Sequence, residues 1–216
     1  MEAYMNIVDL SSRDMVLHII NNTCELLNTL NVSKDNPKVD VKKLATDLEL
    51  TIKESQDLQQ DHARLENNTI FLRSEDTEEQ KRFSIAHEIA HVRVGEGIVV
   101  KVNGQYVTVR FEKKVARKMN HTKVMNETHD RSDVNLVEEA LDYYAASLLL
   151  PSHIFSLFLD RENEEIAKLF AVPVKCVEKR REEIKSELER LDDVTELIPD
   201  CTEPLSEEDT LKLLGL

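Results

Sequence analysis

The sequence predicts an α+β fold that is mainly helical, with one small sheet and a helical region towards its C-terminal end. Apolar residues recur at helical spacing in several long segments, whereas only a few short segments alternate apolar and polar residues. The last third of the chain carries helical periodicity almost throughout. With 216 residues, 41% of them hydrophobic, the chain is long enough to bury one core or two small ones.

Two helices and two strands are expected in the N-terminal third. Residues 12–31 carry apolar side chains at helical spacing, and Ser12 can cap that helix. Asp40 has the position of an N-cap for a second, shorter helix. Residues 50–53 and 69–73 (TIFLR) predict strands, because β-branched and aromatic side chains alternate there with polar ones.

A helix and a hairpin follow. Asp76 and Glu79, three residues apart, form a capping-box pattern, and the helix that they open ends near Val94 before two glycines. Asn103 and Gly104 lie between two alternating runs, which is a strong signal for a β-hairpin.

The second half of the chain is expected to be a loop followed by helices. Residues 112–135 are polar and predict a loop with a helical piece. A long helix is expected from about 134 to 150, where Pro151 stops it. Further helical periodicity breaks at Val172-Pro173.

Charge and composition exclude several classes of protein. The 28 basic and 42 acidic residues give a net charge of -14, which argues against a surface that wraps nucleic acid. No run approaches the roughly 20 apolar residues that a transmembrane helix needs, and the N-terminus lacks a secretory signal. Cys24, Cys176 and Cys201 are odd in number and far apart, which favours reduced thiols over a disulfide framework. We therefore expect a cytoplasmic protein without a membrane partner.

The segment RFSIAHEIAH carries the chemistry of the predicted site. His87 and His91 are four residues apart, so on a helix their imidazoles project from one face, one turn apart. That spacing suits two ligands of a tetrahedral Zn²⁺ ion at about 2.0–2.1 Å. Glu88 is rotated by about 100° from His87, beside the metal, where it can take a proton from a water molecule. A surface helix that carries these residues by chance is the alternative.

A third ligand is expected from LVEEALDYYAASLLLP. Glu138 and Asp142 lie four residues apart on one predicted helical face, and Ala145 and Ala146 would let this helix approach the histidine helix closely. Glu138 can then complete the metal site, while Asp142 accepts a hydrogen bond from the other ring nitrogen of a histidine ligand. The alternatives are Glu139 as the ligand, or an acidic stripe in solvent.

These two motifs, FSIAHEIAH and E-x-x-x-D-x-Y-A-A-x-L-L-x-P, resemble the ImmA/IrrE family of zinc-dependent metallopeptidases, which is HExxH gluzincin-like. The resemblance covers roughly residues 39–155 and includes TIFLR and the segment VDVKKLATDLEL. It implies a zincin-like core that binds one Zn²⁺ per chain through His87, His91 and Glu138, with Glu88 as general base. It also implies that the substrate is a helix-turn-helix transcriptional repressor, whose cleavage derepresses stress or mobile-element genes.

The expected organisation follows from this resemblance. Residues 1–155 form a zincin-like metallopeptidase domain, and within it the hairpin and loop of residues 96–135 are an insertion relative to the family. Residues 156–192 form a helical, helix-turn-helix-like module, and residues 193–216 form an acidic tail. Asp142 stands where the family has Asn or Asp.

Catalysis also needs a donor for the oxyanion and a strand that holds the substrate. The strand TIFLR is expected to offer an edge for an extended peptide. The sequence does not choose among five candidate transition-state donors, which are His121, His129, His153, Tyr143 and Tyr144.

A second class of function is a DNA- or repressor-binding regulatory protein whose zinc site is structural or vestigial. Residues 166–177 have apolar spacing like that of a helix-turn-helix. Pro173, the lack of glycine in the turn and several glutamates argue against DNA binding, so we favour a packing or docking module. The residues available for phosphate contacts are Lys175, Lys179, Arg180 and Arg181.

Overall fold

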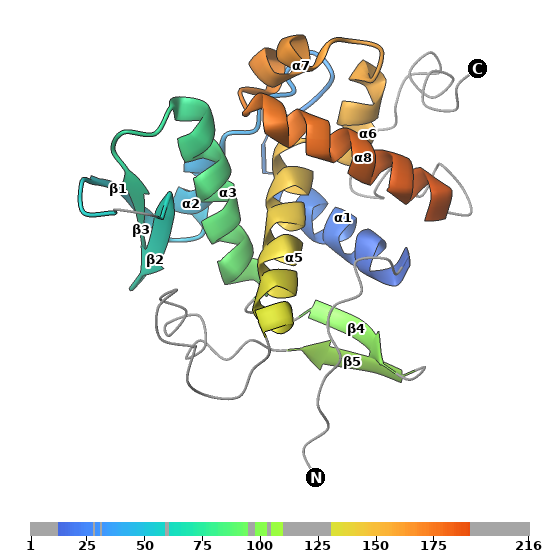
Figure 1. Ribbon diagram of the computed structural model, residues 1–216, viewed down its shortest axis with the longest axis horizontal. Coiled ribbons are helices and arrows are strands. Elements are labelled where there is room, and N and C mark those ends of the chain that lie inside the picture. Colours follow the sequence, from blue (N-terminus) through green and yellow to red (C-terminus); the bar gives the residue numbers. More distant parts are fainter. Residues whose placement is uncertain are drawn as a thin grey trace.

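Two long helices, α3 (Glu78–Val94) and α5 (Arg131–Leu149), pack side by side at the centre of the molecule (Figure 1). A three-stranded sheet flanks α3, α1 (Arg13–Leu27) lies against α5, and the C-terminal helices cover one end of the pair. The predicted α+β, mainly helical class is therefore confirmed. None of the described helices is long and apolar enough to cross a bilayer. The computed structural model describes residues 13–27, 29–30, 32–58, 61–94, 98–102, 105–109 and 131–190.

Helix α2 (Val41–Asp47) begins where the sequence predicts. The Asp40 side chain accepts a hydrogen bond from the backbone N–H of Lys43 at 3.0 Å, which satisfies one of the unpaired amides of the first turn. Val39 and Leu44 are buried in the core on either side of this cap. The cap therefore fixes where the chain turns to enter the core.

Helix α3 starts with a capping box one residue later than predicted. The backbone N–H of Thr77 donates to Gln80 Oε1 at 2.9 Å, and that of Gln80 donates to Thr77 Oγ1 at 3.3 Å. The predicted cap, Asp76, is 2% exposed and lies 2.8 Å from His62 Nδ1, and it accepts a hydrogen bond from Arg73 Nε at 2.7 Å. Because these two neighbours already occupy its carboxylate, the next residue caps the helix.

The small sheet has the strand order β1-β3-β2, with β1 (Thr51–Ser55) parallel and β2 (Ala63–Glu66) antiparallel to β3 (Thr69–Arg73). Asn67 and Asn68 join β2 to β3 with φ of 46° and 59°, a left-handed conformation that asparagine tolerates in hairpin turns. The predicted edge role of TIFLR is wrong, because β1 and β2 pair with both sides of β3. Strand β2 was not predicted, since its sequence ARLE carries no β-branched residue.

The predicted hairpin is confirmed. Strands β4 (Ile98–Val102) and β5 (Gln105–Val109) pair antiparallel, with Val102 opposite Gln105, and β4 lies against α1. Residues 110–130 lie outside the described residues, and α5 already begins at residue 131, a few positions before the helix was expected.

The C-terminal helices are α6 (Ser152–Phe155), α7 (Asn163–Phe170) and α8 (Val174–Arg190), with the short 3-10 helix η2 (Ser156–Phe158) after α6. Ala171 takes the left-handed conformation at φ 53° and ends α7, so the predicted break before Pro173 is confirmed. Apolar side chains from these helices join the same buried cluster as those of α3 and α5. The predicted boundary at residue 155 thus falls inside a shared core, and the division into domains stays a prediction.

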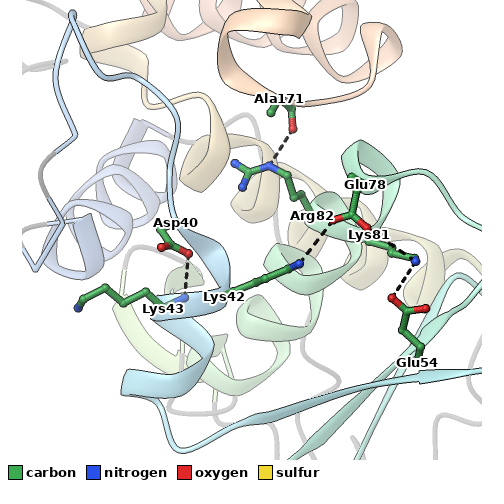
Figure 2. A network of polar contacts seen from close by, with 8 residues as sticks. All are labelled: Asp40, Lys42, Lys43, Glu54, Glu78, Lys81, Arg82 and Ala171. Atoms are coloured by element: carbon green, nitrogen blue, oxygen red, sulfur yellow. Dashed lines mark hydrogen bonds and ion pairs between the residues drawn. The ribbon is translucent and has the colours of Figure 1, made fainter.

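A buried arginine, Arg82, ties α3 to two distant parts of the chain, and Figure 2 shows one of these contacts, the one with Ala171. Arg82 Nε donates to the carbonyl of Ala171 at 2.8 Å, and Arg82 Nη2 donates to the carbonyl of Val39 at 2.7 Å. In the same view, Lys81 Nζ donates to Glu54 Oε1 at 2.9 Å, which connects α3 to β1. These bonds fix the first half of α3, and with it the direction in which the second half presents its histidines.

One expectation from the cysteines is wrong. Cys24 is buried and disulfide-bonded, whereas Cys176 is a free thiol. The distance between cysteines along a sequence does not reveal which thiols approach each other in the fold, so the pattern alone could not predict this bond.

Candidate metal centre

Helix α3 separates its core-facing and site-facing side chains by its periodicity. Ile85 and Ile89 are fully buried in the core. His87 and His91 are partly exposed, and their ring centroids lie 5.0 Å apart with the rings at 69° to each other. The four-residue spacing thus brings the two imidazoles to one face, as the sequence predicts.

A carboxylate from α5 joins the two imidazoles. His87, His91 and Glu138 each offer one ligand atom, and these atoms lie within 4.8 Å of one another. His87 Nε2 and Glu138 Oε2 are 3.3 Å apart. A tetrahedral zinc site with bonds of 2.0–2.1 Å separates neighbouring ligand atoms by about 3.3 Å. Two histidines and a glutamate are also a donor set of catalytic zinc sites, so these residues fit Zn²⁺.

The other ring nitrogen of His87 has its own partner on α5. His87 Nδ1 lies 2.9 Å from Asp142 Oδ1. A carboxylate at that position favours the tautomer that carries its proton on Nδ1, and Nε2 then has a lone pair for a metal ion. The predicted contact between Asp142 and a histidine of the site is therefore present.

Carboxylates dominate the electrostatics of His87. Burial by itself lowers the pKa of its imidazole, whereas the hydrogen bonds to Asp142 and Glu138 and the charge of Glu88 raise that pKa, to about 10. The negative groups prevail because Asp142 and Glu138 lie within 2.9 Å and 3.3 Å of the two ring nitrogens in a partly buried setting. The carboxylates therefore favour a positive charge in the immediate surroundings of this imidazole.

Glu88 is the buried carboxylate beside the cluster. It is 6% exposed, and burial raises its pKa to about 7. The nearby charge of His87 opposes this shift, while the charges of Glu138 and Asp61 add to it. Asp61 precedes β2 and was not among the predicted site residues, since nothing in the local sequence marks it.

The structure describes three of the five predicted transition-state donors, which are His153, Tyr143 and Tyr144. The guanidinium carbon of Arg180 lies over the ring of Tyr143, 5.4 Å from the centroid of that ring. Tyr144 is buried in α5. His153 lines a small cavity against α1, and burial lowers its pKa to about 4. The side chain of Glu139, together with His121 and His129, lies outside the described residues.

Two of the four basic residues predicted to be available for phosphates are engaged within the molecule. Arg180 is 0% exposed and donates to the carbonyl of Leu150 at 3.1 Å and to Ser152 Oγ at 2.7 Å. Arg181 donates to the carbonyl of Leu159 at 2.7 Å. These arginines hold the C-terminal helices together, so neither guanidinium is available for a phosphate.

Comparison with known proteins identifies the family of this chain. The model of the Peptidase M78 family, described as an IrrE N-terminal-like domain, matches residues 39–182. That match runs through the predicted boundary at residue 155. The search among curated proteins finds no match.

A solved structure of a transcriptional regulator from Mycobacterium tuberculosis is similar in fold. The two chains are 11% identical with a TM-score of 0.52, and the alignment covers 80% of this chain and 50% of that one. This chain therefore spans about half the length of that regulator.

Proposed function

The chain belongs to the Peptidase M78 family of IrrE N-terminal-like domains, and on this premise we propose that it is a zinc-dependent endopeptidase. Membership confirms the resemblance to the ImmA/IrrE family that the two motifs indicate. The observation that carries the proposal is the convergence of His87, His91 and Glu138, whose ligand atoms lie within 4.8 Å of one another.

In this proposal the three residues hold one Zn²⁺ ion per chain. When bound, the ion supplies a Lewis acid and lowers the pKa of a water molecule from 15.7 towards about 7. Asp142 keeps the proton on His87 Nδ1, so that Nε2 is directed to the metal. The contact between Asp142 and His87 thus supports the assignment of His87 as a ligand.

Glu88 would act as the general base. Its carboxylate is buried beside the cluster, close enough to His87 and Glu138 for their charges to influence it. It takes a proton from the attacking water and returns it to the nitrogen of the departing amine.

The substrate would be an extended segment of a helix-turn-helix transcriptional repressor, as the family resemblance implies. Strand β2 suits its docking better than β3, because within the described residues β2 pairs with β3 on one side only. Strand β2 also lies against α3, and Asp61 just before it acts on Glu88. An added strand at this edge would pass close to the metal centre.

The test compares Glu88→Gln with the wild type. The variant should retain about one zinc per chain by elemental analysis and lose cleavage of a purified repressor, followed by mass spectrometry, because only the proton carrier has changed. Glu164→Gln, an exposed glutamate of α7, is the matched control and should cleave normally.

Undiminished cleavage by Glu88→Gln would rule out the mechanism. A wild-type protein that binds zinc and the repressor without cutting it would point instead to a regulatory protein with a structural or vestigial zinc site.

A further inference from the structure

We propose that Lys179 of α8 is a positioning residue of the metal centre, which holds the Asp142 carboxylate in the orientation that His87 requires. This inference rests on the proposed zinc site. It assigns to Lys179 a role inside the molecule, in place of the phosphate contact that belongs to the disfavoured DNA-binding alternative.

The two oxygens of Asp142 face two different helices. Oδ1 lies 2.9 Å from His87 Nδ1 on α3, and Oδ2 lies 3.9 Å from Lys179 Nζ on α8. A carboxylate with a single partner can rotate about its last torsion angle, whereas a partner at each oxygen restricts that rotation. Lys179 therefore limits the positions from which Oδ1 can contact the imidazole.

Solvent exposure explains why a second partner matters here. The Asp142 side chain is 40% exposed, so water competes with His87 for its oxygens. The Lys179 side chain is 50% exposed, and an ion pair of this kind is weak by itself. Its effect on the site is therefore expected to be small, and it should be measurable as a change in metal affinity.

Helix α8 is anchored directly beside this contact. Arg180, the next residue, is 0% exposed and donates to Leu150 and Ser152, and its guanidinium lies over the ring of Tyr143. Tyr143 in turn follows Asp142 on α5. The backbone of Lys179 is thus held at a fixed place relative to Asp142, although its own side chain is half exposed.

The charge of Asp142 also influences a second residue of α8, Cys176. Burial and the charge of Glu183 raise the pKa of the Cys176 thiol, Arg180 and Lys179 oppose that shift, and Asp142 adds to it. Cys176 lies one helical turn before Lys179. The charge of Asp142 therefore acts on Cys176 as well as on Lys179, in agreement with the 3.9 Å contact between Asp142 and α8.

The experiment measures the affinity of the full metal-free chain for Zn²⁺ by competition with a chromogenic chelator. Lys179→Gln should weaken binding roughly two- to fivefold, the range expected for an exposed ion pair. Lys179→Arg should restore most of the affinity. Lys175→Gln, an exposed lysine one turn earlier on α8, is the matched control and should bind as the wild type does.

Two further readouts separate positioning from a general structural effect. The visible absorption bands of the Co²⁺-loaded protein should shift in Lys179→Gln, because the His87 ring moves relative to the metal, and they should not shift in Lys175→Gln. In an Asp142→Ala background, Lys179→Gln should cause no additional loss, because the two residues act through one contact.

Equal zinc affinity of Lys179→Gln and the Lys175→Gln control would overturn the inference and leave the proposed function intact. A full additional loss in the Asp142→Ala background would also overturn it. A wild-type chain that binds no zinc would overturn both the inference and the proposed function.

Discussion

Asp142→Ala offers a sharp test of the metal centre, because it removes a partner of His87 without removing any proposed zinc ligand. The contact at 2.9 Å sets the tautomer and the direction of the imidazole. Loss of such a partner typically weakens metal binding 10–100-fold, which corresponds to about 1.4–2.7 kcal/mol. The Asp142 side chain is 40% exposed, so in Asp142→Ala a water molecule can take the place of the missing carboxylate oxygen. We therefore expect zinc affinity to fall by about tenfold.

Zinc titration of the metal-free protein against a competing chelator measures this loss. Asp142→Asn keeps an oxygen acceptor and should stay within about twofold of the wild type. Glu178→Ala, which removes an exposed carboxylate of α8, controls for the change in net charge. Wild-type affinity in Asp142→Ala, or an equal loss in Asp142→Asn, would refute the idea that this acceptor orients His87.

Three further predictions concern the ligand set and the stability of the fold. Glu138→Ala should lose most of its zinc by elemental analysis while Glu139→Ala keeps it, and the reverse result would move the ligand by one residue. Arg180→Met removes a fully buried cation 3.2 Å from the Glu183 carboxylate, which is 13% exposed, and should lower the free energy of unfolding in urea by about 3–5 kcal/mol. The double variant with Glu183→Met should recover most of that loss, and a loss below about 1 kcal/mol in the single variant would contradict the argument.

Asp76→Asn should destabilise the protein at pH 7, because hydrogen bonds with His62 and Arg73 lower the pKa of Asp76 in the folded state despite its burial. The stabilisation by ionised Asp76 is present above the pKa of this group in the unfolded state, and it is lost as the pH falls through the pKa in the folded state. The difference in free energy of unfolding between the wild type and Asp76→Asn, measured in urea, should therefore shrink below about pH 4. A stability difference between the two proteins that stays constant from pH 7 to pH 3 would contradict the stabilising role of the ionised Asp76 carboxylate.

Local features of the fold were predictable because they depend on neighbours along the chain. The cap at Asp40, the hairpin around residues 103–104 and the break before Pro173 follow from backbone preferences of a few residues. The capping box of α3 was predicted one residue too early, since two overlapping patterns fit the same motif. Contacts of Asp76 with His62 and Arg73 decide between those patterns.

Features that depend on tertiary neighbours were missed. TIFLR looks like any exposed strand, and its central place in the sheet follows only from its pairing with β1 and with the unpredicted β2. Arg180 and Arg181 resemble surface cations of a polar helix in the sequence, yet Arg180 bonds to Leu150 and Ser152 and Arg181 to Leu159 within the fold. Periodicity does not distinguish a long basic side chain in solvent from one that crosses a helix interface.

By itself, the sequence determined that His87 and His91 share one face of a helix with Glu88 beside them, because 3.6 residues per turn leave no other arrangement. Only the tertiary structure decided that Glu138 and Asp142 meet those imidazoles, and that Lys179 reaches Asp142. These contacts join segments that are far apart along the chain, and they form only because the core of apolar side chains holds α3, α5 and α8 against one another.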